Sequence, residues 1–369
     1  MAETDQTLKK TPLAEAHQQL GGKMVPFGGW FMPVQYSGLV DEHTTVRTKV
    51  GLFDVSHMGE VRIQGEDALA FTNYLTVNNV TKLEDDQAHY SAFCTPEGTV
   101  VDDLLVYREA ADNFLLVINA ANIEKDVAWI RKNQGNFKVT ITNESDDTAQ
   151  IAIQGPLAQG ILQRVCDADL SEMKYYWFKR CKVGPVSALV SRTGYTGEDG
   201  FECYVAAADA VAVWRLLLET GAEEGIKPAG LGARDSLRLE ARMHLYGNDM
   251  DETTTVLEAG LGWIVKTKNT DDFIGKAAIV AQKKAGVERK LVGFRLLGRG
   301  IARPDCAVIE DGIAVGRVTS GTQGPTLKQS IGMAYVPTHL SRPGTTLQIQ
   351  IRNKLVDAEV VKGPFYKRA

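Results

Sequence analysis

VRIQGEDALAF, residues 61–71, decides the fold, because its pattern returns 90 residues later as IAIQGPLAQGI over residues 151–161. Each copy is a short β-favouring run that ends at a glycine, and a helical spacing of apolar residues begins within three positions of it. Self-similarity at a fixed offset indicates a duplicated structural unit.

The likeness continues downstream of both copies. Residues 114–118 and 201–205 are apolar strands, and an amphipathic helix follows each of them. Each copy therefore reads strand, helix, hairpin, helix. This order predicts a duplicated α+β fold with mainly antiparallel pairing rather than a doubly wound sheet.

The C-terminal part has a different composition. From residue 290 the chain consists of short β runs, and Asp311-Gly312 is a strong hairpin signal. Residues 276–369 hold 16 lysines and arginines against 6 acidic residues, so within the net charge of −5 the rest of the chain carries an excess of 15 negative charges. We expect a discontinuous α+β domain of residues 1–50 and 143–275, an α+β domain of residues 51–142, and a C-terminal all-β barrel of residues 276–369.

Composition excludes several classes of protein. The chain of 369 residues is 44% hydrophobic and 24% charged, as in globular proteins, and no apolar run reaches the roughly 18 residues of a membrane span. Its five cysteines include no CxxC pair, which fits a reducing compartment and argues against disulfides or a cysteine zinc site. We expect a cytoplasmic protein, without a role in nucleic-acid binding because aromatic residues do not interleave with the basic ones.

Two acidic residues interrupt the apolar run GTVVDDLLVY, residues 98–107. Neighbouring side chains on a strand point to opposite faces, so Asp102 and Asp103 face different surroundings. A charge that protects an edge strand from aggregation explains the pair about as well as a functional acid.

The second copy has its own unusual hairpin, SRTGYTGEDGFE at residues 191–202. Its glycines permit positive φ and a close approach of the backbone to a ligand, although an ordinary tight hairpin needs them too. We hypothesise that the hairpins of the two copies bring carboxylates and tyrosines to one shared cavity.

Other motifs are weaker. Asp54, Ser56 and His57 lie too close together on one strand to converge as a catalytic triad. The chain has no phosphate-binding GxxxxGK[ST] and no HExxH, and its six histidines lack the spacing of metal ligands. Residues 23–33, KMVPFGGWFMP, contain too much glycine and proline for regular structure, so we expect an aromatic loop there.

In order along the chain stand FDVSHMGE (53–60), VDDLLVY (101–107), SRTGYTGEDGFE (191–202), PAGLGARDSLRLEA (228–241), YGNDMDE (246–252) and TSGTQGPTL (319–327). This set resembles the folate-binding T-protein (aminomethyltransferase) family of the glycine cleavage system. The resemblance implies three domains around a central folate-binding channel, with a C-terminal β-barrel. It also implies transfer of a methylene group from the aminomethyl-dihydrolipoyl arm of the carrier H-protein to tetrahydrofolate, with release of ammonia.

The resemblance implies roles for particular residues. Asp103 is the catalytic acid, acting by electrostatic orientation or as a general base, and Asp102 is structural. Glu202 reads the donor edge of the pterin, and Arg234 pairs with a carboxylate or the pterin carbonyl region. The expected walls and folate-tail contacts are Met58, Tyr90, Tyr107, Tyr176, Tyr195, Tyr366 and Arg368. Core packing of Tyr176 and a structural ion pair of Arg234 with Asp235 are the plainer alternatives.

Two other functions share this architecture, namely folate-dependent demethylation and non-enzymatic folate-binding factors. The pair at 102–103 favours aminomethyl transfer, and no characteristic cysteine motif surrounds Cys166, Cys181 or Cys203.

Overall fold

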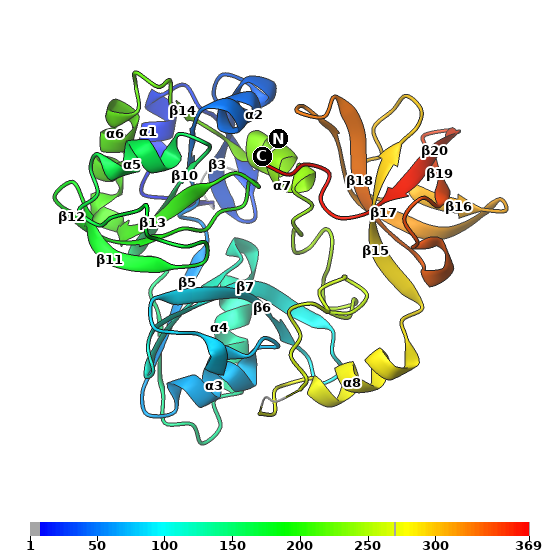
Figure 1. The fold of residues 1–369 in the computed structure, drawn as a ribbon, viewed down its shortest axis with the longest axis horizontal. Helices are drawn as coiled ribbons and strands as arrows, with labels where there is room; N and C mark the ends of the chain where they lie inside the picture. The colour runs from blue at the N-terminus through cyan, green and yellow to red at the C-terminus, as the bar shows by residue number, and fades with distance from the viewer. Residues whose placement is uncertain (1–7, 269–270, 369) are drawn as a thin grey trace. The chain divides into compact units, whose positions relative to one another are not determined.

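The computed structural model describes residues 8–268 and 271–368, and the chain divides into two compact units. Unit 1 comprises Met1–Phe71, Lys82–His89 and Leu104–Asp235, and unit 2 comprises Thr72–Thr81, Tyr90–Asp103 and Ser236–Ala369. Several sheets and helices together confirm the α+β class (Figure 1). The expected division into three domains stays a prediction.

The larger sheet of unit 1 has six strands in the order β11-β12-β13-β10-β4-β14. Their bounds are β4 Gly51–Asp54, β10 Thr148–Gln154, β11 Phe178–Val183, β12 Val186–Ser191, β13 Gly200–Ala206 and β14 Lys227–Pro228. All pairs are antiparallel except β4 with β14. Helices α5 (Ala158–Gln163) and α6 (Ala210–Thr220) pack on this sheet, where the fully buried Trp214 lies in the core (Figure 1).

A second sheet has the strand order β6-β7-β8-β5-β9. Its strands are β5 Gly59–Gln64, β6 Gln87–Cys94, β7 Val100–Ala110, β8 Asn113–Ile118 and β9 Thr140–Asn143. The accompanying helices are α3 (Ala68–Leu75) and α4 (Ile123–Lys132), and α4 buries Ile123, Val127 and Ile130 at helical spacing. Strands β6 and β7 run from one unit into the other.

The sequence repeat is reproduced in the backbone. Gly65 and Gly155 both have φ of +134°, and a Cβ atom at either would lie within 2.5 Å of a backbone carbonyl oxygen. Helices α3 and α5 begin three residues after these glycines, at Ala68 and Ala158. The repeated glycine is therefore required by backbone conformation and close packing.

The expectation of an irregular loop at residues 23–33 was wrong. This segment forms a hairpin of β2 (Lys23–Phe27) and β3 (Trp30–Gln35), which β1 (Lys9–Lys10) extends in the order β1-β3-β2. Gly28 and Gly29 have φ of +56° and +86° and form the two-residue turn that favours hairpins. Pro26 is tolerated on the edge strand, and Pro33 lies beside a register shift.

Unit 2 contains a closed six-stranded barrel in the order β15-β18-β17-β16-β19-β20, which confirms the predicted C-terminal β-barrel (Figure 1). Its strands are β15 Arg289–Leu296, β16 Ala307–Glu310, β17 Ile313–Gly324, β18 Gln329–Pro337, β19 Thr346–Ile351 and β20 Lys354–Val361. Asp311 and Gly312 form the expected tight turn, with φ of +52° and +80°. Helix α8 (Lys276–Ala285) precedes the barrel.

A buried ion pair attaches the barrel to the preceding segment of unit 2. Arg238, near the end of α7 (Leu231–Glu240), lies 2.6 Å from the Asp249 carboxylate, and both side chains are almost completely buried. Thr319 and Ser320 of β17 donate hydrogen bonds to the other oxygen of Asp249, at 2.6 and 2.7 Å.

The remaining elements are short. They are α1 Ala14–Gln19, α2 Leu39–Thr48 and the 3-10 turns Val80–Lys82, Ala120–Asn122, Ala207–Asp209 and Thr338–Leu340. Among the described residues, no helix has both the length and the apolar character that crossing a membrane requires.

Candidate active site

Glu202 is the centre of a buried polar cluster in unit 1. It lies on β13 opposite Ala152 of β10 and Ser191 of β12, and only 6% of its surface is exposed. Thr193 donates a hydrogen bond of 2.5 Å to Glu202 Oε2. Burial raises the pKa of Glu202, and the Thr193 hydroxyl, the Arg234 charge and Gln150 oppose this shift. The fold thus buries a hydrogen-bond acceptor, the Glu202 carboxylate, whose ionised form costs free energy as long as no ligand donates to it.

Hydroxyl groups extend this cluster along the sheet. Tyr107 Oη lies 3.0 Å from Tyr204 Oη and 3.3 Å from Thr193 Oγ1, and Gln150 donates to Tyr204 Oη at 3.1 Å. Sequence reasoning named Tyr107 but missed Tyr204. The signal was available, because residues 202 and 204 lie on the same face of a strand.

Apolar and aromatic side chains surround this polar row. Tyr107 belongs to a buried cluster with Phe178 and Leu189, against which Met58 and Tyr176 pack. Tyr176 has a φ of +66°, which is unusual and costly for an aromatic residue. Its backbone is held by hydrogen bonds to Arg192 and from Ala88. Three of the expected wall residues, Met58, Tyr107 and Tyr176, thus lie together.

Arg234 and Tyr195 also lie together in unit 1. The guanidinium carbon of Arg234 is 4.6 Å from the centroid of the Tyr195 ring, a cation–π geometry. Burial, together with the Arg234 charge, lowers the pKa of His57 to about 4, so His57 is neutral at physiological pH. Asp54 instead contacts His17, at 2.8 Å, which agrees with the exclusion of a triad of Asp54, Ser56 and His57.

Gln154, the last residue of β10, holds the 191–202 hairpin in place. Gln154 donates to the Thr193 carbonyl at 3.0 Å and accepts from Thr196 at 2.9 Å. A Cβ atom at Gly194 would lie 2.0 Å from Gln154 Oε1, and one at Gly200 would lie 2.5 Å from the Ile153 carbonyl oxygen. Close packing of the hairpin against β10 therefore explains these two glycines.

Asp103 and Tyr90 form a separate group in unit 2. Asp102 is completely buried and Asp103 is partly exposed, as the alternation along β7 predicted. The Tyr90 hydroxyl donates to Asp103 Oδ2 at 2.8 Å. The Tyr90 ring stacks on Trp263, with centroids 6.1 Å apart. Sequence reasoning missed Trp263, because this residue is far from Tyr90 in the sequence.

The expected residues therefore fall into two groups. Met58, Tyr107, Tyr176, Tyr195, Glu202 and Arg234 belong to unit 1, and Tyr90, Asp103, Tyr366 and Arg368 belong to unit 2. Strand β7 is common to both, since it carries Asp103 and Tyr107 four residues apart. The Tyr366 amide donates to the Glu240 carbonyl at 2.8 Å, which holds the C-terminal segment within unit 2.

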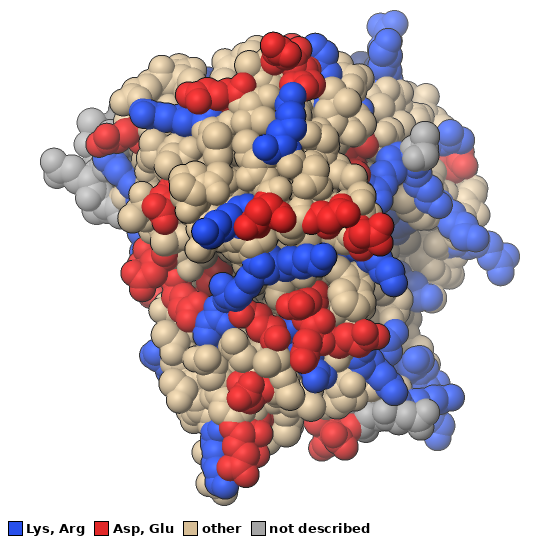
Figure 2. Space-filling view, turned by 60° about the vertical axis from the view of Figure 1, so that its left-hand side comes forward, with Lys and Arg blue, Asp and Glu red and all other residues tan. Residues whose placement is uncertain are grey.

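Figure 2 shows lysines and arginines interspersed with aspartates and glutamates on the face in view. Along the right-hand edge of that view, lysines and arginines predominate.

Comparisons with known proteins agree with these features. The family model of the GCVT N-terminal domain matches residues 13–269, and that of the glycine cleavage T-protein C-terminal barrel domain matches residues 289–367. An aminomethyltransferase of Desulfitobacterium hafniense (strain Y51) is 51% identical over 98% of this chain and 99% of its own length. One of Bacillus licheniformis is 51% identical, with 98% of this chain and 99% of that protein covered.

A solved structure agrees as well. The glycine cleavage system aminomethyltransferase T from Bartonella henselae is 33% identical, has a TM-score of 0.92, and covers 98% of this chain and 99% of its own. The chain belongs to the glycine cleavage T-protein family of aminomethyltransferases.

Proposed function

We propose that this protein transfers the methylene group of the aminomethyl-dihydrolipoyl H-protein to tetrahydrofolate and releases ammonia. The observation that carries the proposal is the buried Glu202 carboxylate among hydroxyl and amide donors, in a chain of this family. Tetrahydrofolate is a cosubstrate here, since it accepts the one-carbon unit.

Glu202 binds the pterin. A reduced pterin presents two adjacent N–H donors, and a carboxylate accepts both in a bidentate arrangement. Thr193 and Gln150 fix the Glu202 side chain before the ligand binds, which lowers the entropic cost of binding. Met58, Tyr107, Tyr176 and Tyr195 supply apolar and aromatic walls for the ring. Arg234, whose guanidinium lies over the Tyr195 ring, pairs with a carboxylate or the pterin carbonyl region.

Asp103 acts on the reacting atoms. Its carboxylate orients the folate nitrogen that attacks the methylene carbon and stabilises the iminium charge that develops as ammonia leaves. It also accepts the nitrogen proton as a general base. The Tyr90 hydroxyl holds one oxygen of Asp103 in place, and Tyr366 and Arg368 contact the folate tail.

The H-protein docks on the basic C-terminal part of the chain. Lys283 and Lys284, in the last turn of α8, and Lys290, on β15, are exposed and present positive charge. A complementary acidic carrier is steered to such a surface. We place the reaction in the cytoplasm, because free cysteines stay reduced in that compartment.

A reconstituted assay tests the proposal. The full chain is mixed with tetrahydrofolate and H-protein carrying the aminomethyl group, and methylene-tetrahydrofolate and ammonia are measured. We expect both products in equal amounts, and neither without H-protein. Folate binding without either product would identify a folate-binding factor, and absence of folate binding would overturn the assignment of Glu202.

A further inference from the structure

Cys166 and Cys181 lie together although 15 residues separate them in the sequence. Cys166 follows α5 and Cys181 lies on β11, and their sulfur atoms are 3.6 Å apart. A carboxylate oxygen of Asp167 completes a group in which all three candidate ligand atoms lie within 4.8 Å of one another. The absence of a CxxC motif concealed this cluster from the sequence.

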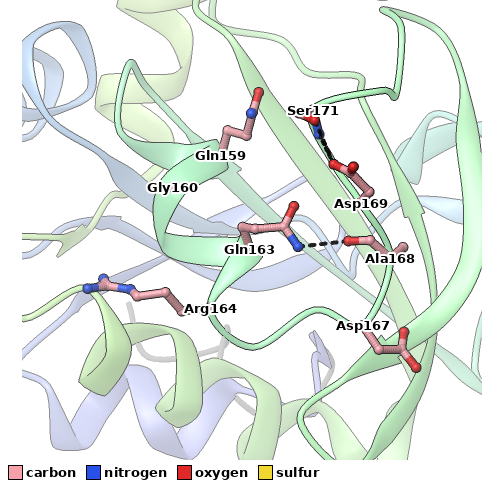
Figure 3. A pocket seen from close by; sticks show the side chains of 8 residues that line it. All are labelled: Gln159, Gly160, Gln163, Arg164, Asp167, Ala168, Asp169 and Ser171. Carbon is pink, nitrogen blue, oxygen red and sulfur yellow. Dashed lines mark hydrogen bonds between the residues drawn. The ribbon is translucent and has the colours of Figure 1, made fainter.

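The surrounding chain fixes the cluster. Cys166 forms an isolated antiparallel bridge with Val183, and the Lys182 amide donates to Asp167 Oδ1 at 2.7 Å. Gln163 donates to the Ala168 carbonyl at 2.8 Å, as Figure 3 shows, and accepts from the Leu170 amide at 2.8 Å. The loop is therefore held against β11 by contacts that do not involve the sulfur atoms.

The separation of the sulfur atoms suits a tetrahedral ion. With Zn–S bonds of about 2.3 Å, two ligands of a tetrahedral zinc ion lie about 3.8 Å apart. The observed 3.6 Å is close to this distance and much longer than the roughly 2.05 Å of a disulfide bond. The hydrogen bond from Lys182 orients the Asp167 carboxylate and leaves Oδ2 for a metal.

We propose that Cys166, Cys181 and Asp167 form a binding site for zinc(II), with water as the fourth ligand. Thiolates select such thiophilic ions, and each thiol releases its proton to solvent when the metal binds. Two cavities give access: one of about 540 Å³ is lined by Cys181, Asp167 and Lys182, and one of about 640 Å³ by Asp167, Ala168 and Gln163 (Figure 3). All of these residues belong to unit 1.

Cadmium titration of the full chain in a non-thiol reductant tests the site. Cadmium–thiolate bonds absorb in the ultraviolet. Thiolates hold cadmium more tightly than zinc, so zinc is added in excess to displace it, and zinc does not absorb there. We expect one cadmium per chain, displaced by zinc, and the same result for the matched control Cys306→Ser, whose thiol lies on a different unit. Cys166→Ser and Cys181→Ser should lose the absorption, and Asp167→Asn should weaken binding at least about tenfold.

A second measurement does not depend on the folding of these variants. Zinc should slow alkylation of Cys166 and Cys181 in the wild-type chain, mapped by peptide mass, and leave Cys306 unaffected. The proposal is overturned if wild type shows no cadmium absorption, if Cys166→Ser binds as wild type does, or if zinc protects neither thiol. A Cys166–Cys181 disulfide that persists in reductant, with no metal bound, would also overturn it.

Discussion

Replacing Glu202 by glutamine should weaken tetrahydrofolate binding strongly while the protein stays folded. Glutamine keeps one acceptor oxygen but turns an N–H donor toward the second donor of the pterin. One charge-assisted hydrogen bond is then lost and the other becomes neutral, which costs about 2.5–4 kcal/mol, or about 70- to 900-fold in Kd. The free energy of unfolding should not fall. Because burial raises the pKa of Glu202, its ionised carboxylate destabilises the folded state at pH values above its unfolded pKa, and glutamine removes that cost.

The assay is calorimetric titration with tetrahydrofolate over a range of pH. Because the pKa of Glu202 is raised and the ionised form binds, wild-type affinity should fall as the pH is lowered through that pKa. The glutamine variant should lack this pH dependence. Its midpoint of thermal unfolding should match or exceed that of wild type.

Glu60 provides a matched control in the same unit. It is a buried acid on β5 whose pKa burial and the nearby Glu144 also raise well above the ordinary value. Glu60→Gln should bind folate as wild type does. Equal affinity of Glu202→Gln and wild type, or equal weakening in both variants, would refute the assignment of the pterin edge to Glu202.

Three further predictions concern stability and docking. Asp249→Asn removes the negative charge that compensates the buried Arg238 guanidinium, so the free energy of unfolding in urea should fall by about 3–5 kcal/mol. A loss below about 1 kcal/mol would contradict the attachment of the barrel through this pair. Burial alone would raise the pKa of Asp54, but hydrogen bonds from His17, Ser56 and Thr11 outweigh it and lower the pKa. The stability that this carboxylate contributes is therefore present above its unfolded pKa of about 3.9 and lost as the pH falls through the lower folded value. The difference in unfolding free energy between wild type and Asp54→Asn should shrink between pH 6 and pH 3, and a constant difference would refute this reasoning. Charge reversal at the exposed Lys283, Lys284 and Lys290 should raise the KM for H-protein about tenfold at low salt and little at high salt. An unchanged KM at every salt concentration would exclude these lysines as the docking surface for H-protein.

Local patterns predicted much of the fold. The repeated glycines at 65 and 155 marked equivalent turns, and the β runs after residue 290 became the strands of the barrel. Both features depend on local conformation and periodicity, which the sequence carries directly. The hairpin over residues 23–33 was missed because its glycines and prolines were counted against regular structure, although Gly28 and Gly29 form the turn between its strands.

The residues of the candidate site were harder to predict from the sequence than the fold. Alternation along β7 separated the buried Asp102 from the more exposed Asp103. The partner of Asp103, Tyr90, lies 13 residues away on another strand, and the proximity of Cys166 to Cys181 depends on a loop bridged to β11. Such pairs arise from tertiary packing, which no spacing of residues in one sequence reveals.

The most direct test of the proposed mechanism compares wild type with Asp103→Asn in a single turnover. Saturating tetrahydrofolate and aminomethyl-loaded H-protein are used, and the Kd for folate is measured on the same samples. The rate of methylene-tetrahydrofolate formation should fall by about 10²–10⁴ while the Kd stays within roughly threefold. Loss of rate and folate affinity in equal proportion, or an unchanged rate, would contradict the role of Asp103 at the reacting atoms.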